Sequence, residues 1–260
     1  MDLFSERIKN RHKRWWVERE ENDFKHLAGK MEGRKFVENI GLKTPALYHE
    51  SDTVEEIPSF TELPEKFVIK PSSGWSAKNV FVMVNGENQL DESSWSRDEI
   101  INHIANQQNI NQNKKVKIMI EEYLEDWKNP DCIPYDYKFY MFGGECAFIT
   151  IIERNSKVNS NKNKFWNVTM DWRPCDFKII KTQTPGETLP DKPDCWDELC
   201  ETATKLGKEL GIFMRIDLYA TKRGAVFGEF TPQPHGGNGF TEEADKWLGS
   251  IWRGLEGAGE

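Results

Sequence analysis

Two acidic residues in the C-terminal part of the chain could together bind a cation. Asp217 and Glu229 stand 12 positions apart in the segment 212–232, IFMRIDLYATKRGAVFGEFTP, whose pattern is that of two strands joined by a turn. Carboxylates are hard oxygen ligands of the kind that divalent cations such as Mg²⁺ bind. The chemistry of this pair depends on whether the strands place the two carboxylates side by side.

The turn between the strands fixes their pairing. A three-residue loop ending at Gly224 would use this glycine in the left-handed conformation, and Thr221 would face Ala225. Asp217 then lies directly opposite Glu229, with Cβ atoms ~4.5–5.5 Å apart. One face of the hairpin would carry Ile216, Leu218, Ala220, Val226, Gly228 and Phe230, and the other Arg215, Asp217, Tyr219, Phe227, Glu229 and Thr231. A slip by one residue would mix charges into the apolar face, which burial forbids.

Like charges that face each other in a sheet destabilise it unless a cation lies between them. Arg215, two residues before Asp217, could supply that cation and make a structural ion-pair cluster. A divalent metal ion could do the same and would make the hairpin a functional site. The hairpin alone leaves both hypotheses open. Neutralising Asp217 or Glu229 should destabilise an ion-pair cluster, but should relax an empty metal site.

The elements around this hairpin can be predicted from apolar periodicity and from turn residues. Residues 1–40 are rich in charge with interspersed aromatics and predict helices that end before Gly41. Further along, the patterns predict a strand over 67–70, a small-residue loop, a helix from the Ser96–Glu99 capping box to about residue 108, a strand from Val116, a hairpin turning at Gly143-Gly144, and a helix over 193–210.

Composition excludes several classes of protein. The 260 residues carry 35 Lys and Arg against 43 Asp and Glu, a formal charge of −8, which argues against binding along a nucleic acid backbone. No apolar run approaches the ~18 residues that a membrane span needs, and the charged N-terminal segment lacks the apolar stretch of a signal peptide, so we expect a cytoplasmic protein. The five cysteines show no zinc-site spacing. No P-loop, dinucleotide, zinc-protease or serine-hydrolase motif is present.

The order of the motifs resembles the ATP-grasp superfamily. A strand lysine, a small-residue loop, a strand ending in Glu-Glu, a D-x-K strand and a hairpin with Asp and Glu follow one another. The sequence is most similar to the teichuronopeptide-biosynthesis (TupA-like) branch. The matching stretches are KMEGRKFVENIG, FVIKPSSGWS, IMIEEYL, DYKFYMFGG, FWNVTMDW, FMRIDLYA, FGEFTPQPHGGNGF and DKWLG, over about residues 30–250.

The resemblance implies an α+β fold of the ATP-grasp type, with the nucleotide between two α+β lobes. Residues 1–55 would form an N-terminal helical segment. Residues 56–115 would form the small lobe, with the Lys70 strand and the phosphate loop. Residues 116–260 would form the large lobe, with the hinge and the metal hairpin.

The resemblance also implies a set of ATP-binding residues. Lys70 would contact the α- and β-phosphates, the small-residue loop would close over the triphosphate through its backbone N–H groups, and the hinge would contact the adenine edge. Glu125 or Asp126 would hold the ribose. The implied set is Lys70, Ser72, Ser73, Gly74, Ser76, Glu121, Glu122, Tyr123, Leu124 and Asp136. The plain alternative for each charged member is a solvated side chain at a strand end.

The residues of the large lobe would carry the chemistry. Asp217 and Glu229 match metal ligands that hold Mg²⁺ against the phosphates, while Thr231 stands where related ligases often have an asparagine. Lys138 matches a basic residue near the transferred phosphoryl group, and Arg215 fits a catalytic role at an acylphosphate. The glycine-rich loop after Thr231 would contact phosphate or the acceptor substrate. His235 in this loop is more consistent with a hydrogen-bonded loop residue than with an acid–base role.

By resemblance, the expected activity is that of an ATP- and Mg²⁺-dependent carboxylate–amine ligase. It would form an amide or peptide bond through an acylphosphate, with an amino acid and a sugar acid as candidate substrates, in cell-surface polymer biosynthesis. The alternatives are a kinase of the same fold and a nucleotide-binding module without catalysis. The sequence leaves the substrates and homodimer formation undecided.

Overall fold

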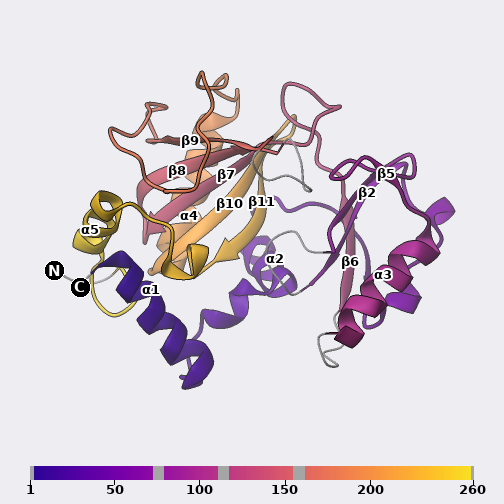
Figure 1. The fold of residues 1–260 in the computed structure, drawn as a ribbon, viewed down its shortest axis with the longest axis horizontal. Helices are drawn as coiled ribbons and strands as arrows, with labels where there is room; N and C mark the ends of the chain where they lie inside the picture. Colours follow the sequence, from indigo (N-terminus) through magenta and orange to yellow (C-terminus); the bar gives the residue numbers. More distant parts are fainter. Residues whose placement is uncertain (1–2, 73–78, 111–116, 155–161, 259–260) are drawn as a thin grey trace.

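Two antiparallel sheets, each covered by helices, form the body of the protein (Figure 1). The computed structural model describes residues 3–72, 79–110, 117–154 and 162–258. The expected α+β fold with two lobes is confirmed by this arrangement of sheets and helices. None of the helices in the described ranges has the length and apolar character that a membrane span would need.

The first sheet has six strands in the order β1-β6-β2-β3-β4-β5. Their bounds are β1 Leu47–Ser51, β2 Lys66–Pro71, β3 Phe81–Val84, β4 Glu87–Asn88, β5 Ser93–Ser94 and β6 Ile118–Glu122. Helix α3 (Arg97–Ile110) buries Ile100 and Ile104 against one face. It begins with the predicted capping box, in which Ser96 Oγ accepts from the Glu99 backbone N–H (3.3 Å).

The predicted segment boundaries at residues 55 and 115 stay a prediction. Strands β1 and β6 lie outside 56–115, but both pair within the first sheet, β6 with β1 on one side and β2 on the other. The chain passes to the second sheet after β6.

The second sheet has five strands in the order β11-β10-β7-β8-β9. Their bounds are β7 Asp136–Phe142, β8 Glu145–Glu153, β9 Lys164–Val168, β10 Phe213–Thr221 and β11 Gly224–Thr231. Phe142 pairs with Glu145, so the predicted two-residue Gly143-Gly144 turn is confirmed. Helix α4 (Trp196–Leu210) packs its apolar side on one face of this sheet, and Gly211 after it has the left-handed φ of +61° that ends helices.

The opposite face of the second sheet is apolar at one end and charged in the middle. Helices α1 (Phe4–His12) and α5 (Glu242–Ile251) cover the apolar end, where Phe4, Phe142 and Phe213 pack together. The charged part, which includes Asp217, lies next to this cluster on the same face, because Asp217 and Phe213 are separated by an even number of residues along β10.

The β10–β11 hairpin contains the predicted pair in a register that differs near the turn. Asp217 lies opposite Glu229, as expected. Thr221, however, pairs with Gly224 rather than with Ala225, so the connection is a two-residue turn, and a β-bulge between Asp217 and Leu218 restores the register. Gly228 is the extra residue on β11, where a Cβ would lie 2.9 Å from the Tyr219 ring.

Because of the bulge, two residues of β11 lie on faces of the hairpin other than those predicted. Phe227 pairs with Leu218 and joins the core under α4, whereas Val226 pairs with Tyr219. The prediction was the reverse, with Val226 on the apolar face and Phe227 on the face that carries Asp217. A bulge moves every residue between itself and the turn to the other side of the strand, while residues beyond it, including Glu229, keep their side.

The N-terminal helices connect the two sheets. A π-helical turn (Lys13–Val17) and a 3-10 turn (Lys25–Ala28) lie between α1 and helix α2 (Lys30–Asn39). The predicted helical character of this segment and the stop at Gly41, whose φ is +74°, are confirmed. Gly33 of α2 packs against Phe230 of β11, and the Lys30 backbone N–H donates to the Ser72 carbonyl next to β2 (3.0 Å).

Candidate active site

Asp217 lies at the centre of a buried network on the charged face of the second sheet. Arg215 donates to it through two nitrogens, Nε to Oδ1 (2.7 Å) and Nη2 to Oδ2 (2.8 Å), and Lys138 Nζ also donates to Oδ2. Asp217 is 2% exposed. Desolvation alone would raise its pKa, but the charges of Arg215 and Lys138 outweigh it and lower the pKa to about 2. The carboxylate is therefore fixed and ionised.

Glu229 is held more loosely than Asp217. Arg215 Nη2 lies 3.2 Å from Glu229 Oε1 and 2.8 Å from Thr231 Oγ1, and Thr231 itself donates to Glu229 (3.4 Å). Since Nη2 has two hydrogens for acceptors on three residues, its bond to Glu229 is shared. The Glu229 side chain keeps 40% of its surface exposed. It is thus the carboxylate of the pair that can exchange its partner for a ligand.

A second ion-paired group continues the network along β7. Asp136 is buried and pairs with Arg154, at the end of β8, while Lys138 Nζ lies 3.9 Å from it. Desolvation raises the pKa of Asp136, but the charges of Arg154 and Lys138 outweigh this effect and lower it. Tyr219 stands opposite Asp136 across the ladder. The Asp136 carboxylate is thus already paired with cations of the second sheet, which supports a structural role for this residue.

On the first sheet, Lys70 of β2 pairs with Glu121 of the neighbouring strand β6. Ser72 follows β2 and donates its backbone N–H to the Lys117 carbonyl (2.8 Å). The other predicted members of the phosphate loop, Ser73, Gly74 and Ser76, lie outside the described residues.

Lys30, at the first position of α2, is a candidate that the sequence reasoning missed. Burial lowers its pKa, Glu229 and Glu121 raise it, and Lys70 lowers it again. The ammonium group therefore interacts electrostatically with both sheets. A cation at a helix N-terminus opposes the helix dipole, and this misplaced charge was the available signal in KMEGRKFVENIG.

The predicted hinge, Glu121–Leu124, covers the end of β6 and the two residues after it, and its last three residues line a cavity of about 470 Å³ between the two sheets. Its walls come from β1, the start of β2, the hinge and the β10–β11 turn, and include Tyr48, Lys66, Glu122, Tyr123, Leu124, Glu125, Thr221 and Arg223. Lys66 and Glu125 pair at 3.2 Å in this wall. The cavity brings the hinge residues Glu122–Leu124 together, while Glu121 lies one step away, beside Lys70.

The Glu122 side chain serves as a tie between elements. It accepts from the backbone N–H of Ala46 (2.8 Å) and pairs with Arg223 of the hairpin turn (2.5 Å). Asp126, one of the two ribose candidates, accepts from the backbone N–H groups of Lys128 and Asn129. Glu125 lines the cavity and is the candidate that lies at the predicted nucleotide site.

The glycine-rich loop lies beside the Asp217 network. A short 3-10 turn (Pro234–Gly237) follows β11, with His235, Gly236 and Gly237 in left-handed conformations. Desolvation lowers the pKa of the His235 ring, and the charges of Arg215 and Lys138 lower it further. The His235 ring is therefore neutral at neutral pH.

The residues fit a magnesium ion held jointly with phosphates. Within the described ranges, no three His, Cys, Asp or Glu side chains form a group that could hold a metal ion by themselves. Mg²⁺, however, commonly takes one or two carboxylates and completes its octahedron with water and phosphate oxygens. Asp217 and Glu229, with Thr231 beside them, offer this partial set, because Glu229 is accessible and only shares the Arg215 donor.

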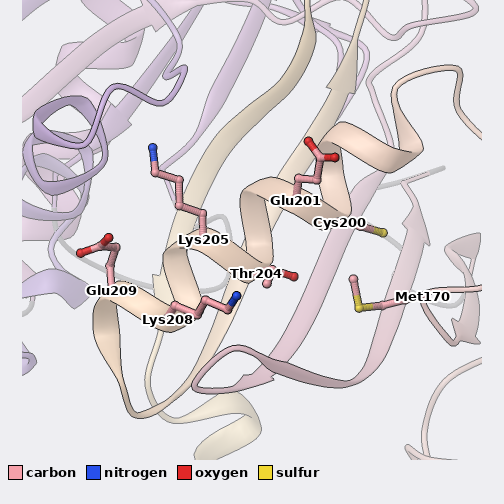
Figure 2. A pocket seen from close by; sticks show the side chains of 7 residues that line it. All are labelled: Met170, Cys200, Glu201, Thr204, Lys205, Lys208 and Glu209. Carbon is pink, nitrogen blue, oxygen red and sulfur yellow. The ribbon is translucent and has the colours of Figure 1, made fainter.

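A second hollow, of about 400 Å³, lies on helix α4 (Figure 2). It is lined by Met170, Cys200, Glu201, Thr204, Lys205, Lys208 and Glu209. Helix α4 covers the face of the second sheet opposite to Asp217, so this hollow belongs to the other side of the lobe. Burial raises the pKa of the Cys200 thiol to about 12, which makes it a poor nucleophile.

Among solved structures, the fold is similar to D-alanine–D-alanine ligase from Bacillus anthracis, with a TM-score of 0.50 and 16% identity over 87% of this chain and 63% of that one. For the same enzyme complexed with ATP, the TM-score is 0.46 and the identity is 15%, over 79% of this chain and 53% of that one. For an L-amino acid ligase from Bacillus licheniformis, the TM-score is 0.47 and the identity is 13%, over 88% of this chain and 47% of that one. The chain thus spans less than two thirds of each of these proteins.

A comparison with curated proteins found no match. The model of the TupA-like ATP-grasp family matches residues 6–253, nearly the whole chain. Its match includes both sheets, α2 and the β10–β11 hairpin. The chain belongs to the TupA-like ATP-grasp family.

Proposed function

We propose that the protein is an ATP- and Mg²⁺-dependent ligase that joins a carboxylate to an amine and releases ADP and phosphate. The observation that carries this proposal is the carboxylate pair on the second sheet, in which Asp217 lies opposite Glu229 and the Glu229 side chain stays accessible. Lys70 pairs with Glu121 on the first sheet. Such groups suit a triphosphate and its metal ion, because phosphates would neutralise the lysine while the metal would neutralise the carboxylates.

The order of residues along the β10–β11 hairpin indicates where each part of the substrates would lie. Thr221 lines the hinge cavity at one end of β10, Asp217 lies in the middle, and Arg215 lies towards the other end. With ~3.4 Å per residue, Thr221 and Asp217 are separated by about 14 Å along the strand. Adenosine in the hinge cavity would therefore place its phosphates near Asp217 and Lys70. The transferred phosphoryl group and the second substrates then lie near Arg215 and the loop after Thr231.

Asp217 and Glu229 would hold Mg²⁺, which would neutralise the negative charge of the phosphates. Lys138 keeps Asp217 ionised and oriented, so its role would be to position the carboxylate. Lys70 and Lys30 would bind the phosphates as flexible point charges. Ser72 and the predicted loop residues Ser73, Gly74 and Ser76 would cover the triphosphate, and Glu121–Leu124 with Glu125 would hold the adenosine.

The reaction requires two transfers. A carboxylate oxygen of the substrate forms a bond to the γ-phosphorus while the bond to the ADP oxygen breaks. The amine then attacks the acyl carbon and loses a proton, and the carbon–oxygen bond to phosphate breaks. Arg215, with Nη2 directed towards Glu229 and Thr231, would stabilise the negative charge on the acylphosphate.

The finer assignment follows from the family. We infer an amino acid as one substrate, with a sugar acid as a candidate for the other, in the biosynthesis of a cell-surface polymer. A kinase that passes the γ-phosphoryl group to a hydroxyl remains the second candidate, because every group described for the first transfer would serve it equally.

Two measurements test the proposal. ATP with Mg²⁺ should raise the melting temperature, since binding to the folded state stabilises it by mass action. Hydroxylamine with a panel of amino acids and uronic acids should then give hydroxamates with equal amounts of ADP. Absence of ATP and ADP binding at millimolar concentration in calorimetry would contradict nucleotide binding. ADP release that needs a hydroxyl compound and forms no hydroxamate would favour the kinase.

A further inference from the structure

Helix α1 is built against the loop that follows β11. Arg11 Nη1 donates to the carbonyl oxygens of Phe213 (2.9 Å) and Pro232 (3.3 Å), and so bridges the start of β10 and the end of β11. Gly237 packs so closely on α1 that a Cβ would lie 2.9 Å from the Ser5 carbonyl oxygen. The helix therefore supports both ends of the loop 232–237.

The anchor of this contact is a buried cation. Arg11 is fully buried, pairs with Glu256 (2.8 Å) and lies over the rings of Trp15 and Trp252 at 4.9 and 4.7 Å. Desolvation lowers its pKa to about 10, so it stays charged at neutral pH. Such a group fixes the position of α1 relative to the second sheet.

One contact joins α1 to a side chain of the loop. His12 Nδ1 donates to Gln233 Oε1 (2.9 Å), since a carboxamide oxygen is an acceptor. The His12 ring also stacks on Trp16, with centroids 5.8 Å apart and an angle of 14° between the planes. His12 is exposed, so the contact can be removed without opening a core.

The loop that α1 supports lies where the last substrate must enter. Thr231, directly before it, accepts a hydrogen bond from Arg215 Nη2 at 2.8 Å. Adenosine occupies the other end of the hairpin in the proposed arrangement. A nucleophile that attacks the acylphosphate therefore approaches from the loop side.

We propose that α1 positions the loop 232–237 for the amine substrate, and that His12 is a positioning residue that acts through Gln233. This inference rests on the proposed ligase function. The class of ligand is a primary amine carried by a molecule large enough to touch the loop, such as an amino acid. Loss of this hydrogen bond should raise the KM for the amine about fivefold.

Four variants of the full chain separate the possible effects. His12→Phe keeps the stacking on Trp16 and loses the hydrogen bond, and Gln233→Leu removes the acceptor. His12→Asn keeps a donor in the place of Nδ1 and should restore the contact. Lys13→Ala is the matched control, because Lys13 is the next residue and makes an exposed pair with Glu18 at 3.1 Å.

The activity readout compares two nucleophiles with the same carboxylate. Hydroxylamine at molar concentration is too small to need the loop, whereas a mixture of the twenty amino acids has to bind there. We expect His12→Phe and Gln233→Leu to lower ADP release with subsaturating amino acids about fivefold, with unchanged hydroxamate formation and ATP affinity. His12→Asn and Lys13→Ala should match the wild type. Equal ADP release by all variants would overturn the inference and leave the ligase function intact.

Hydrogen exchange gives a readout that does not depend on activity. The amides of Gly236 and Asn238 donate within the loop to the carbonyls of Gln233 and His235, both at 3.0 Å. They should exchange faster in His12→Phe and Gln233→Leu, and at the wild-type rate in His12→Asn. Unchanged protection in all variants would overturn the positioning role. A wild type that forms neither hydroxamate nor ADP would contradict the ligase function, and exchange would still decide whether His12 holds the loop.

Discussion

Lys70 on the first sheet pairs with Glu121 on the adjacent strand, and their side chains keep 14% and 9% of their surface exposed. Asp217 on the second sheet receives three hydrogen bonds from Arg215 and Lys138, and Arg215 continues to Glu229 and Thr231. The first sheet thus offers a lysine on a flexible stem, while the second holds its charges in a fixed and mutually bonded set.

This difference suits two tasks. A nucleotide must enter and leave between the sheets, and a lysine with one carboxylate partner can move from that partner to a phosphate. Charge that develops during group transfer is best stabilised by groups that are already oriented and need no reorganisation. The comparison predicts that substitution of a buried charge in the second sheet, such as Asp217, affects stability strongly, whereas substitution of Lys70 in the first sheet mainly affects nucleotide binding.

The largest expected effect is the contrast between Asp217→Asn and Glu229→Gln. Asp217→Asn leaves Arg215 and Lys138 buried without their counter-charge and should lower the free energy of unfolding by ~3 kcal/mol. Glu229→Gln removes one partner of an exposed, shared contact and should change it by less than ~1 kcal/mol. Both should abolish ADP release. Urea unfolding of the protein without nucleotide measures the first two values.

From the sequence alone, the two substitutions were expected to change stability in the same direction. A bare metal site would relax when either carboxylate is neutralised, and a simple ion-pair cluster would be destabilised by both changes. The structure combines the two, because Arg215 already stands between the carboxylates and one of them stays accessible. Equal destabilisation by the two variants would mean that Glu229 is as firmly held as Asp217, and would argue against its exchange for a metal ion.

The acid stability of the protein should depend on the same carboxylate. The folded pKa of Asp217 is about 2, below the ~3.9 of an unfolded chain. The unfolded state therefore binds the proton first, so this stabilisation is complete above pH ~4 and is lost as the pH falls towards 2. It is worth ~2–3 kcal/mol at neutral pH.

The difference between the unfolding free energies of the wild type and Asp217→Asn should therefore shrink over this pH interval. Glu229→Gln is the control and should keep the wild-type acid dependence. A difference that stays constant from pH 5 to 2.5 would show that Asp217 has an ordinary pKa and that the network is weaker than its geometry suggests.

Lys70→Met tests the first sheet. The fold should persist with a smaller loss of stability than in Asp217→Asn, while ATP affinity should fall about tenfold or more, as for a hydrogen bond between charged groups. Lys117→Met is a suitable control, because Lys117 stands beside β6 and makes an exposed pair with Asp52 at 2.9 Å. Unfolding by Lys70→Met with intact nucleotide affinity would make Lys70 a structural residue and reverse the comparison.

Much of this arrangement could be predicted from the sequence, because the alternation of apolar and polar residues in a strand and the residues that form a turn are local features of the chain. The pairing of Asp217 with Glu229 and the Gly143-Gly144 turn followed from them. The bulge at Gly228 did not, since a glycine in a strand fits either a bulge or a regular pair until the Tyr219 ring beside it is known. The error was confined to the turn and to the residues between the bulge and the turn.

The residues that were missed depend on contacts between distant segments. Lys30 joins the site because α2 packs on β11 and reaches Ser72, and Arg154 joins it because β8 ends beside Asp136. No local pattern in the sequence reports these approaches. The charge at the start of α2 was a hint for Lys30, and no comparable signal existed for Arg154.

The smallest expected effect concerns His235, where the second sheet meets the loop. Desolvation and the charges of Arg215 and Lys138 lower the pKa of its ring below the ~6.5 of an ordinary histidine. A folded pKa below the unfolded one stabilises the protein above pH ~6.5, and this contribution is lost as the pH falls through the folded value. An NMR titration of the ring, identified with His235→Asn and referenced to the urea-unfolded chain, should show a lower midpoint in the folded protein. The free energy of unfolding of His235→Asn should accordingly depend less on pH than that of the wild type below pH ~6.5. A ring that titrates equally in both states would place His235 outside the field of the cluster, and would separate the loop from the charges that the second sheet holds in place.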